Sequence, residues 1–144
     1  MSSVSPVHIL LVEDDAGDVW FTRDTFEYYK VGNELHVVSD GESALRFVRR
    51  QPPYQDAPRP GLILLDLDLP RMDGREVLAA LAADGDFRDI PVVILTTSQA
   101  ETDLIRSHAL GASAYMTKPV DFDRLVNIVR QLDDFCLTVT RSHR

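Results

Sequence analysis

The stretch that decides the fold is Gly61-Leu62-Ile63-Leu64-Leu65-Asp66, an apolar run that ends abruptly in a carboxylate. A short run without alternating polar residues is typical of a parallel strand covered on both faces. Two more runs of this kind occupy Val7–Val12 and Pro91–Leu95, and two weaker runs occupy Leu35–Val38 and Ala112–Met116. We interpret all five as strands, with Leu35–Val38 nearer an edge of the sheet.

Segments with helical periodicity separate these runs. They are Ala16–Lys30, a segment that opens at Asp40, one that follows Asp73-Gly74, Ala100–Leu110, and one that begins near Asp121. Asp40 is a suitable N-cap, and Gly111 is a suitable stop for the fourth segment. Strict strand–helix alternation predicts an α/β fold, with a parallel sheet, right-handed crossovers and helices on both faces. We expect one domain over residues 1–144.

Composition limits the classes of function. The chain has 144 residues, 44% hydrophobic and 26% charged, with a net charge of -8. This composition is that of a globular protein, and the negative charge argues against nucleic acid or an anionic membrane as a partner. The single Cys136 cannot form an intramolecular disulfide, and no apolar run approaches a membrane span. We therefore expect a cytoplasmic protein.

Polar residues follow four of the five runs directly. Val12 leads to Glu13-Asp14-Asp15, Leu65 to Asp66, Leu95 to Thr96, and the fifth run leads through Thr117 to Lys118. In a doubly wound sheet the carboxyl ends of the strands lie along one edge, where ligands bind. The sequence therefore predicts that these side chains converge on one pocket.

Each of these residues also has a purely structural interpretation. Asp15 suits the N-cap of the first helix, Thr96 suits a strand end, and Lys118 suits a solvated surface position. Asp66 is harder to explain in this way, because a carboxylate directly after a buried run needs a partner. Carboxylates after two strands, together with a Thr and a Lys after two others, favour a functional site.

The charges indicate the chemistry. Glu13, Asp14 and Asp66 would repel one another at close range unless a cation lay between them. Carboxylate-rich, all-oxygen ligation suits Mg²⁺. A carboxylate beside Mg²⁺ is a competent nucleophile for phosphorus and gives an aspartyl phosphate. Lys118 and the Thr96 hydroxyl are then placed to neutralise the phosphoryl oxygens.

Four motifs in order, and the spacing between them, carry a resemblance to a known family. The motifs are the acidic pair Glu13-Asp14, the block LLDLDLPRMDG around Asp66, LTTS with Thr96, and YMTKP with Tyr115 and Lys118. Over nearly the whole chain the sequence resembles the receiver domain of two-component response regulators.

The resemblance implies a flavodoxin-like, five-stranded sheet in the order 2-1-3-4-5 with five helices. It implies that Asp66 is the phosphoacceptor and that Mg²⁺ binds Glu13, Asp14, Asp66 and the backbone carbonyl of Asp68. It makes Thr96 and Tyr115 the switch pair. It also makes Lys118 a catalytic residue that precedes a cis bond to Pro119.

A narrower resemblance concerns partners. The VEDD start, the loop over residues 51–60, LTTSQAETD and the tail DDFCLTV are similar to regulators that pair with bacterial phytochromes, although Cys136 stands where those tails commonly have Trp. The implied phosphodonor is a sensor histidine kinase, and this narrower resemblance points to a phytochrome. No output domain follows the last helix, so we expect the output to be a protein contact or a phosphorelay step.

The last helix also predicts assembly. Its buried stripe is expected to hold Phe122, Leu125, Val129, Leu132 and Cys136, with the receiver core over about residues 7–134 and an extension over 135–144. Near its end Phe135, Cys136, Leu137 and Val139 make the helix apolar almost all round, which is typical of a covered surface. We predict a homodimer through the fourth helix, fifth strand and fifth helix.

Two other functions remain open from the residues. Asp66-Leu67-Asp68 after an apolar strand also resembles the nucleophile motif of haloacid-dehalogenase-type phosphatases, which use Mg²⁺, a Thr and a Lys. A receiver-like interaction module that needs no phosphate is the third possibility. A receiver accepts at most one phosphoryl group and is not an enzyme that acts on other substrates. A phosphatase hydrolyses many substrate molecules, and a pure interaction module accepts no phosphoryl group.

Overall fold

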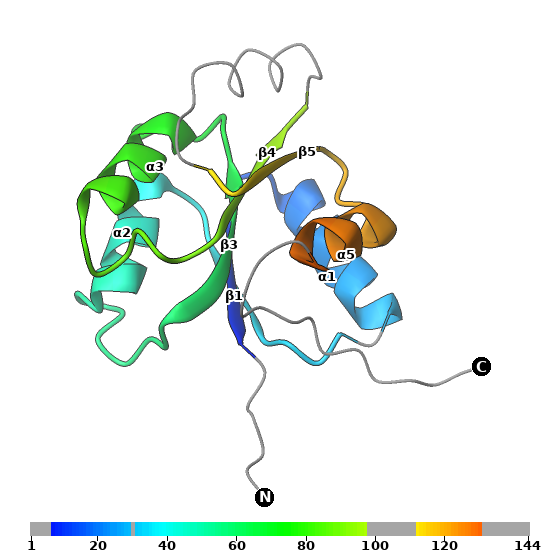
Figure 1. Ribbon diagram of the computed structural model, residues 1–144, viewed down its shortest axis with the longest axis horizontal. Coiled ribbons are helices and arrows are strands. Elements are labelled where there is room, and N and C mark those ends of the chain that lie inside the picture. The colour runs from blue at the N-terminus through cyan, green and yellow to red at the C-terminus, as the bar shows by residue number, and fades with distance from the viewer. Residues whose placement is uncertain (1–6, 30, 98–111, 131–144) are drawn as a thin grey trace, which may run out of the picture.

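The computed structural model describes residues 7–29, 31–97 and 112–130 of the chain (Figure 1). The strands are β1 His8–Val12, β2 Leu35–Val38, β3 Pro60–Asp66, β4 Val92–Thr96 and β5 Ala114–Thr117. The helices are α1 Ala16–Tyr28, α2 Gly41–Arg49, α3 Gly74–Ala83 and α5 Phe122–Arg130. Every strand predicted from an apolar run is present, within one or two residues at each end.

All strand pairs are parallel, and the sheet has the order β2-β1-β3-β4-β5. β2 is an edge strand, as its weaker apolar run predicted. Helices α2 and α3 cover one face of the sheet, and α1 and α5 cover the other (Figure 1). This is the flavodoxin-like doubly wound arrangement that the resemblance implied.

The core forms two layers, one on each face of the sheet. In β1, Leu10 and Val12 pack toward α2 and α3, while Ile9 and Leu11 pack toward α1 and α5, and all four are completely buried. Because both faces of the central strands are covered, polar residues in β1 and β3 are confined to the strand ends. This is the physical reason for the uninterrupted apolar runs.

Aspartates begin three of the helices. The Asp15 carboxylate accepts hydrogen bonds from the backbone N–H groups of Gly17 and Asp18 at the start of α1. Asp40 caps α2 through the N–H of Ser43, and Asp73 caps α3 in a capping box. The structural interpretation of Asp15 is therefore confirmed.

Several predicted features lie outside the described residues. They include Lys30 at the end of the first predicted helix, the helix predicted over 100–110, and the chain from residue 131 onward. Within the described part, α1 ends at Tyr28 with Tyr29 as its C-cap. None of the helices described is long and apolar enough to cross a bilayer.

Candidate functional site

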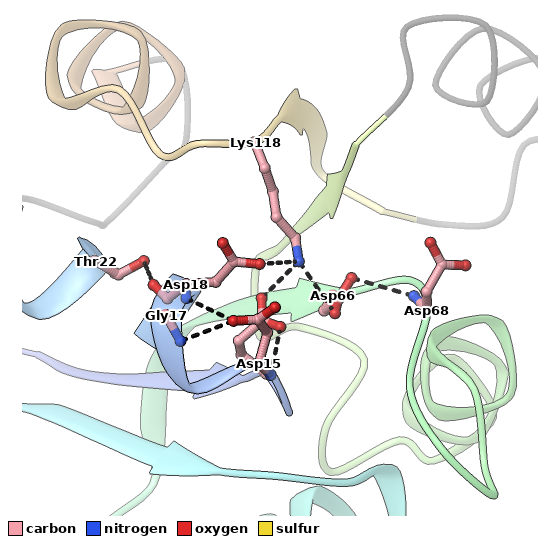
Figure 2. A network of polar contacts seen from close by, with 8 residues as sticks. Asp15, Gly17, Asp18, Thr22, Asp66, Asp68 and Lys118 are labelled. Carbon is pink, nitrogen blue, oxygen red and sulfur yellow. Dashed lines mark hydrogen bonds and ion pairs between the residues drawn. The ribbon is translucent and has the colours of Figure 1, made fainter. Parts of the chain in front are cut away.

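Three side chains from three strand ends meet at one edge of the sheet. Glu13 follows β1, Asp66 is the last residue of β3, and Lys118 follows β5. Glu13 is 2% exposed and Asp66 is 3% exposed. The convergence that the order of polar residues predicted is therefore present (Figure 2).

The ammonium group of Lys118 connects the carboxylates. Its Nζ lies 2.7 Å from Oε1 of Glu13, 3.2 Å from Oδ2 of Asp66 and 3.0 Å from Oδ2 of Asp18. Figure 2 shows Lys118 reaching from the β5 side toward Asp66 and toward Asp18 at the start of α1. The positive charge that these carboxylates require is thus supplied by the chain itself.

Backbone contacts hold the three side chains in place. The N–H of Lys118 donates to the carbonyl of Thr96 over 2.7 Å, and the Lys118–Pro119 peptide bond is cis, as the resemblance implied. The N–H of Asp68 donates to Oδ1 of Asp66 over 3.2 Å, and the N–H of Asp15 donates to Oε2 of Glu13 over 3.1 Å. Both carboxylates are therefore held from two sides.

Burial and charge act in opposite directions on these groups. Burial raises the pKa of Glu13 to about 7, although hydrogen bonds from Lys118 and from the Asp15 N–H partly offset it, and the charge of Asp66 raises it further. For Lys118, burial alone would lower the pKa. The hydrogen bonds to Glu13 and Asp18, with the charges of Asp66 and Glu13, outweigh burial and hold the pKa above its ordinary value. The lysine is therefore charged, and the pKa of Glu13 lies close to neutral pH.

An open depression of about 560 Å³ lies over this cluster. It is lined by Glu13, Asp14, Asp15, Ala16, Gly17, Asp18, Asp66, Asp68, Thr97 and Lys118. Asp14 and Asp68 are exposed at its rim, while Glu13 and Asp66 form its floor. A polar ligand can reach Asp66 from solvent.

The donor set fits a hard divalent cation. Carboxylate oxygens of Glu13, Asp14 and Asp66 lie within 4.8 Å of one another. This group of ligands contains oxygen donors alone and opens on a solvent-filled depression, which suits an ion that keeps several waters, such as Mg²⁺ or Mn²⁺. The residues present therefore fit the predicted metal.

The predicted switch residues lie on neighbouring strands. Thr96 ends β4 and is completely buried, and it pairs in register with Thr117. Tyr115 is half-buried and packs against the core layer that faces α2 and α3. Thr97, one residue after Thr96, is exposed and lines the depression.

Asp18, one of the three carboxylates that contact Lys118, was not predicted from the sequence as a site residue. Asp18 lies in the first turn of α1, three residues after the N-cap Asp15. A carboxylate in the first turn is favoured by the helix dipole, and this helix begins at the sheet edge where the site lies. This position in the sequence was the one indication that Asp18 could belong to the site, but carboxylates are common in the first turn of helices that carry no site.

Comparison with known proteins agrees with this geometry. The family model of the response regulator receiver domain matches residues 9–130. The chain is 43% identical over 136 residues to the response regulator Rcp1 of Synechocystis sp., which covers 94% of this chain and 92% of Rcp1.

Solved structures of similar proteins share the fold. The bacteriophytochrome response regulator RtBRR superimposes with a TM-score of 0.85 at 40% identity, covering 94% of this chain and 83% of RtBRR. The Mn²⁺-bound form of Rcp1 gives a TM-score of 0.73 at 40% identity, covering 93% of this chain and all of the other (100%). The phosphorylated cyanobacterial phytochrome response regulator RcpA gives 0.74 at 38% identity, covering 92% and 98% of the two chains.

These relatives, like the chain described here, combine the doubly wound sheet with a receiver sequence over nearly their full length. Receivers of this kind act in signalling by phosphorelay, and the acidic pocket of the family binds a divalent metal ion. The fold, the family match and the arrangement of carboxylates and lysine at the strand ends lead to the same conclusion: the chain belongs to the response regulator receiver domain family.

Proposed function

We propose that this chain is a phosphoacceptor in a phosphorelay and that Asp66 carries the phosphoryl group. The observation that carries the proposal is the contact between Lys118 and Asp66 at the floor of an open acidic depression. A carboxylate that is buried, paired with an ammonium group and still reachable from solvent is placed to act as a nucleophile. The proposal extends to this chain the chemistry that defines its family.

The transfer step follows from the side chains. A carboxylate oxygen of Asp66 attacks the phosphorus of a phosphohistidine, forming an O–P bond while the P–N bond breaks. The bonding pair returns to the imidazole of the donor, which takes up a proton from solvent. Lys118 stabilises the negative charge on the phosphoryl oxygens, and we assign the same role to the hydroxyl of Thr96.

We assign the metal site to the side chains of Glu13, Asp14 and Asp66 and the backbone carbonyl of Asp68, with Mg²⁺ as the ion. When bound, the ion supplies positive charge that neutralises the phosphoryl oxygens and the repulsion among the carboxylates. The all-oxygen donor set supports this assignment. Lys118 bridges two of these carboxylates, Glu13 and Asp66.

We further propose that Thr96 and Tyr115 switch the surface of the domain. In the phosphorylated state the Thr96 hydroxyl contacts the phosphoryl group, and the Tyr115 ring takes the space behind it. The support is their placement: Thr96 ends β4 one residue after Leu95, the register partner of Asp66, and Tyr115 lies on the adjacent strand β5. Such a change is a population shift, limited by the contacts of the phosphoryl group with each state.

The phosphodonor we propose is a cytoplasmic histidine kinase domain, and a bacterial phytochrome is the candidate sensor. The support for the phytochrome is the similarity to RtBRR and RcpA, which are phytochrome response regulators. A homodimer through the fourth-helix segment, β5 and α5 completes the proposal. Its support is the apolar sequence Phe135, Cys136, Leu137 and Val139 at the end of the chain.

A stoichiometry experiment tests this function against a phosphatase. The protein is incubated with acetyl phosphate and Mg²⁺, and both protein-bound phosphoryl groups and released phosphate are measured. A receiver takes up at most one phosphoryl group per chain on a carboxylate. Rapid turnover of unrelated phosphomonoesters would instead indicate a phosphatase, and a complete lack of uptake would indicate a phosphate-independent interaction module.

A further inference from the structure

A second cluster of metal-ligating side chains lies at the opposite end of the sheet. His8 begins β1, His36 lies in β2, and Glu34 directly precedes β2. The phosphoacceptor site lies at the carboxyl ends of the strands, whereas His8 stands at the amino end of β1. The two clusters share no residue.

Strand register places the three side chains on one face. Ile9 pairs with Leu35 and Leu10 with His36, so Glu34 lies beside His8 one position earlier. Side chains on a strand alternate between faces, and residues 8 and 10, like residues 34 and 36, therefore point to the same side. That side is the one covered by α2, because the ring of His36 lies against the ring of Phe47 in α2, with 5.4 Å between the ring centroids.

The ligand atoms converge on a small volume. Nδ1 of His8 lies 3.0 Å from Nε2 of His36. Oε1 of Glu34 lies 3.7 Å from Nδ1 of His8, and Oε2 lies 3.9 Å from Nε2 of His36. Zinc–ligand distances of about 2.0–2.2 Å in a tetrahedral site place neighbouring ligand atoms about 3.3–3.6 Å apart. The three observed distances bracket that spacing.

A hydrogen bond between the two imidazoles would account for the 3.0 Å contact alone. It would not account for Glu34, whose oxygens approach both ring nitrogens at distances beyond a hydrogen bond. The side chains of His8 and His36 are 35% and 20% exposed, and that of Glu34 is 68% exposed. An ion can therefore enter from solvent and keep a water as its remaining ligand.

We propose that His8, His36 and Glu34 form a second metal site, specific for Zn²⁺ or a similar transition-metal ion. Two imidazoles and one carboxylate suit Zn²⁺, whereas Mg²⁺ prefers oxygen donors. Burial lowers the pKa of His36, which keeps its imidazole in the neutral form that binds metal. The ion would join edge strand β2 to β1 across 28 residues of chain.

A Zn²⁺ titration by calorimetry tests this site, using untagged protein with excess Mg²⁺. An Asp66→Asn background reduces Zn²⁺ binding at the acidic site. We expect one Zn²⁺ per chain in that background and a higher thermal unfolding midpoint when it binds. Adding His8→Gln should weaken Zn²⁺ binding by about tenfold or more and remove the rise in the midpoint.

Matched variants separate the site from general effects of histidine loss. His143→Gln replaces another of the histidines in the chain and should leave Zn²⁺ binding unchanged. His36→Gln would also remove the ring contact with Phe47 and could disturb packing. Glu34→Gln avoids this problem because it keeps the size of an exposed side chain, and it should weaken Zn²⁺ binding without loss of fold. Lack of one-to-one binding in the Asp66→Asn background would overturn the proposal. Equal affinity with and without His8→Gln and Glu34→Gln would overturn it as well.

Discussion

At the residue scale, the site is a balance between burial and charge. Glu13 and Asp66 are almost completely buried, and Lys118 contacts both at hydrogen-bond distance. Burial disfavours the charged form of Glu13, and the ammonium group favours it. The pKa of Glu13 stays raised because burial outweighs the hydrogen bonds from Lys118 and the Asp15 N–H, and the charge of Asp66 raises it further.

The raised pKa of Glu13 predicts a pH-dependent metal site. A metal ligand must be deprotonated, so binding of Mg²⁺ should strengthen by about tenfold per pH unit as the pH rises toward neutrality. The increase should level off above about pH 7, where Glu13 is already charged. Calorimetric titrations with Mg²⁺ between about pH 5 and pH 8 measure this profile. Proteins are ordinarily most stable in that pH range.

The free energy of unfolding of the metal-free protein should change with pH in the opposite direction to the Mg²⁺ affinity. Because the pKa of folded Glu13 lies above its ordinary value of 4.5, the folded chain binds more protons between about pH 4.5 and about pH 7. The contribution of Glu13 to stability therefore decreases as the pH rises through that window. Glu13→Gln should flatten both profiles; an unchanged pH dependence in this variant would show that another group is responsible.

At the element scale, helix α3 is packed directly on β3, the strand that ends in the proposed nucleophile Asp66. A Cβ atom on Gly74 would lie 2.5 Å from the carbonyl oxygen of Asp66 and 2.8 Å from Cα of Leu67. Both contacts are to backbone, which cannot move aside without moving Asp66. Gly74 is therefore required by the close approach of α3 to the end of β3.

Gly74→Ala should displace Asp66 from Lys118 and Glu13. We expect a loss of about 1–3 kcal/mol in the free energy of unfolding from overpacking. We also expect slower labelling by acetyl phosphate. Urea denaturation and labelling kinetics measure the two effects.

Gly85→Ala is the matched control for this substitution. Its added Cβ would lie 3.4 Å from the flexible end of Arg88, which can move aside. This variant should fold and label as the wild type does. Wild-type stability and labelling in Gly74→Ala would show that the contact with Asp66 is not rigid.

Particular residues show what could be predicted from the sequence. Apolar runs such as Leu62–Leu65 identify strands because burial on both faces excludes polar residues. The polar residues that follow four of the five runs mark the sheet edge at which the site lies. Asp18 could not be found in this way, because its contact with Lys118 depends on how the first turn of α1 faces β5. The His8–Glu34–His36 cluster escaped for a similar reason: it depends on the register of β1 with β2.

At the scale of the whole molecule, the sheet separates two chemically different ends. The carboxyl ends of the strands carry oxygen ligands and a lysine, and the amino end of the β1–β2 pair carries imidazoles and a carboxylate. The apolar residues of the proposed dimer surface follow Arg130 in the chain. Assembly is therefore a property to be tested on the full chain.

Phe135→Asp tests the predicted homodimer. A charge in an apolar, self-complementary interface is costly to bury, so the variant should be monomeric by light scattering at micromolar concentration. Thr140→Asp adds the same charge in the polar tail and should leave the dimer intact. A full-length wild-type protein that is monomeric with and without a phosphate mimic would contradict the prediction.

The most direct test of the account is the mass of the intact protein after incubation with acetyl phosphate and Mg²⁺. Wild type should gain one phosphoryl group that is lost on treatment with hydroxylamine, and Asp68→Asn, which keeps its backbone carbonyl, should still gain it. Asp66→Asn should gain none while keeping its fold, because an amide oxygen is a poor nucleophile. Undiminished labelling of Asp66→Asn would contradict the assignment of Asp66 as the phosphoacceptor.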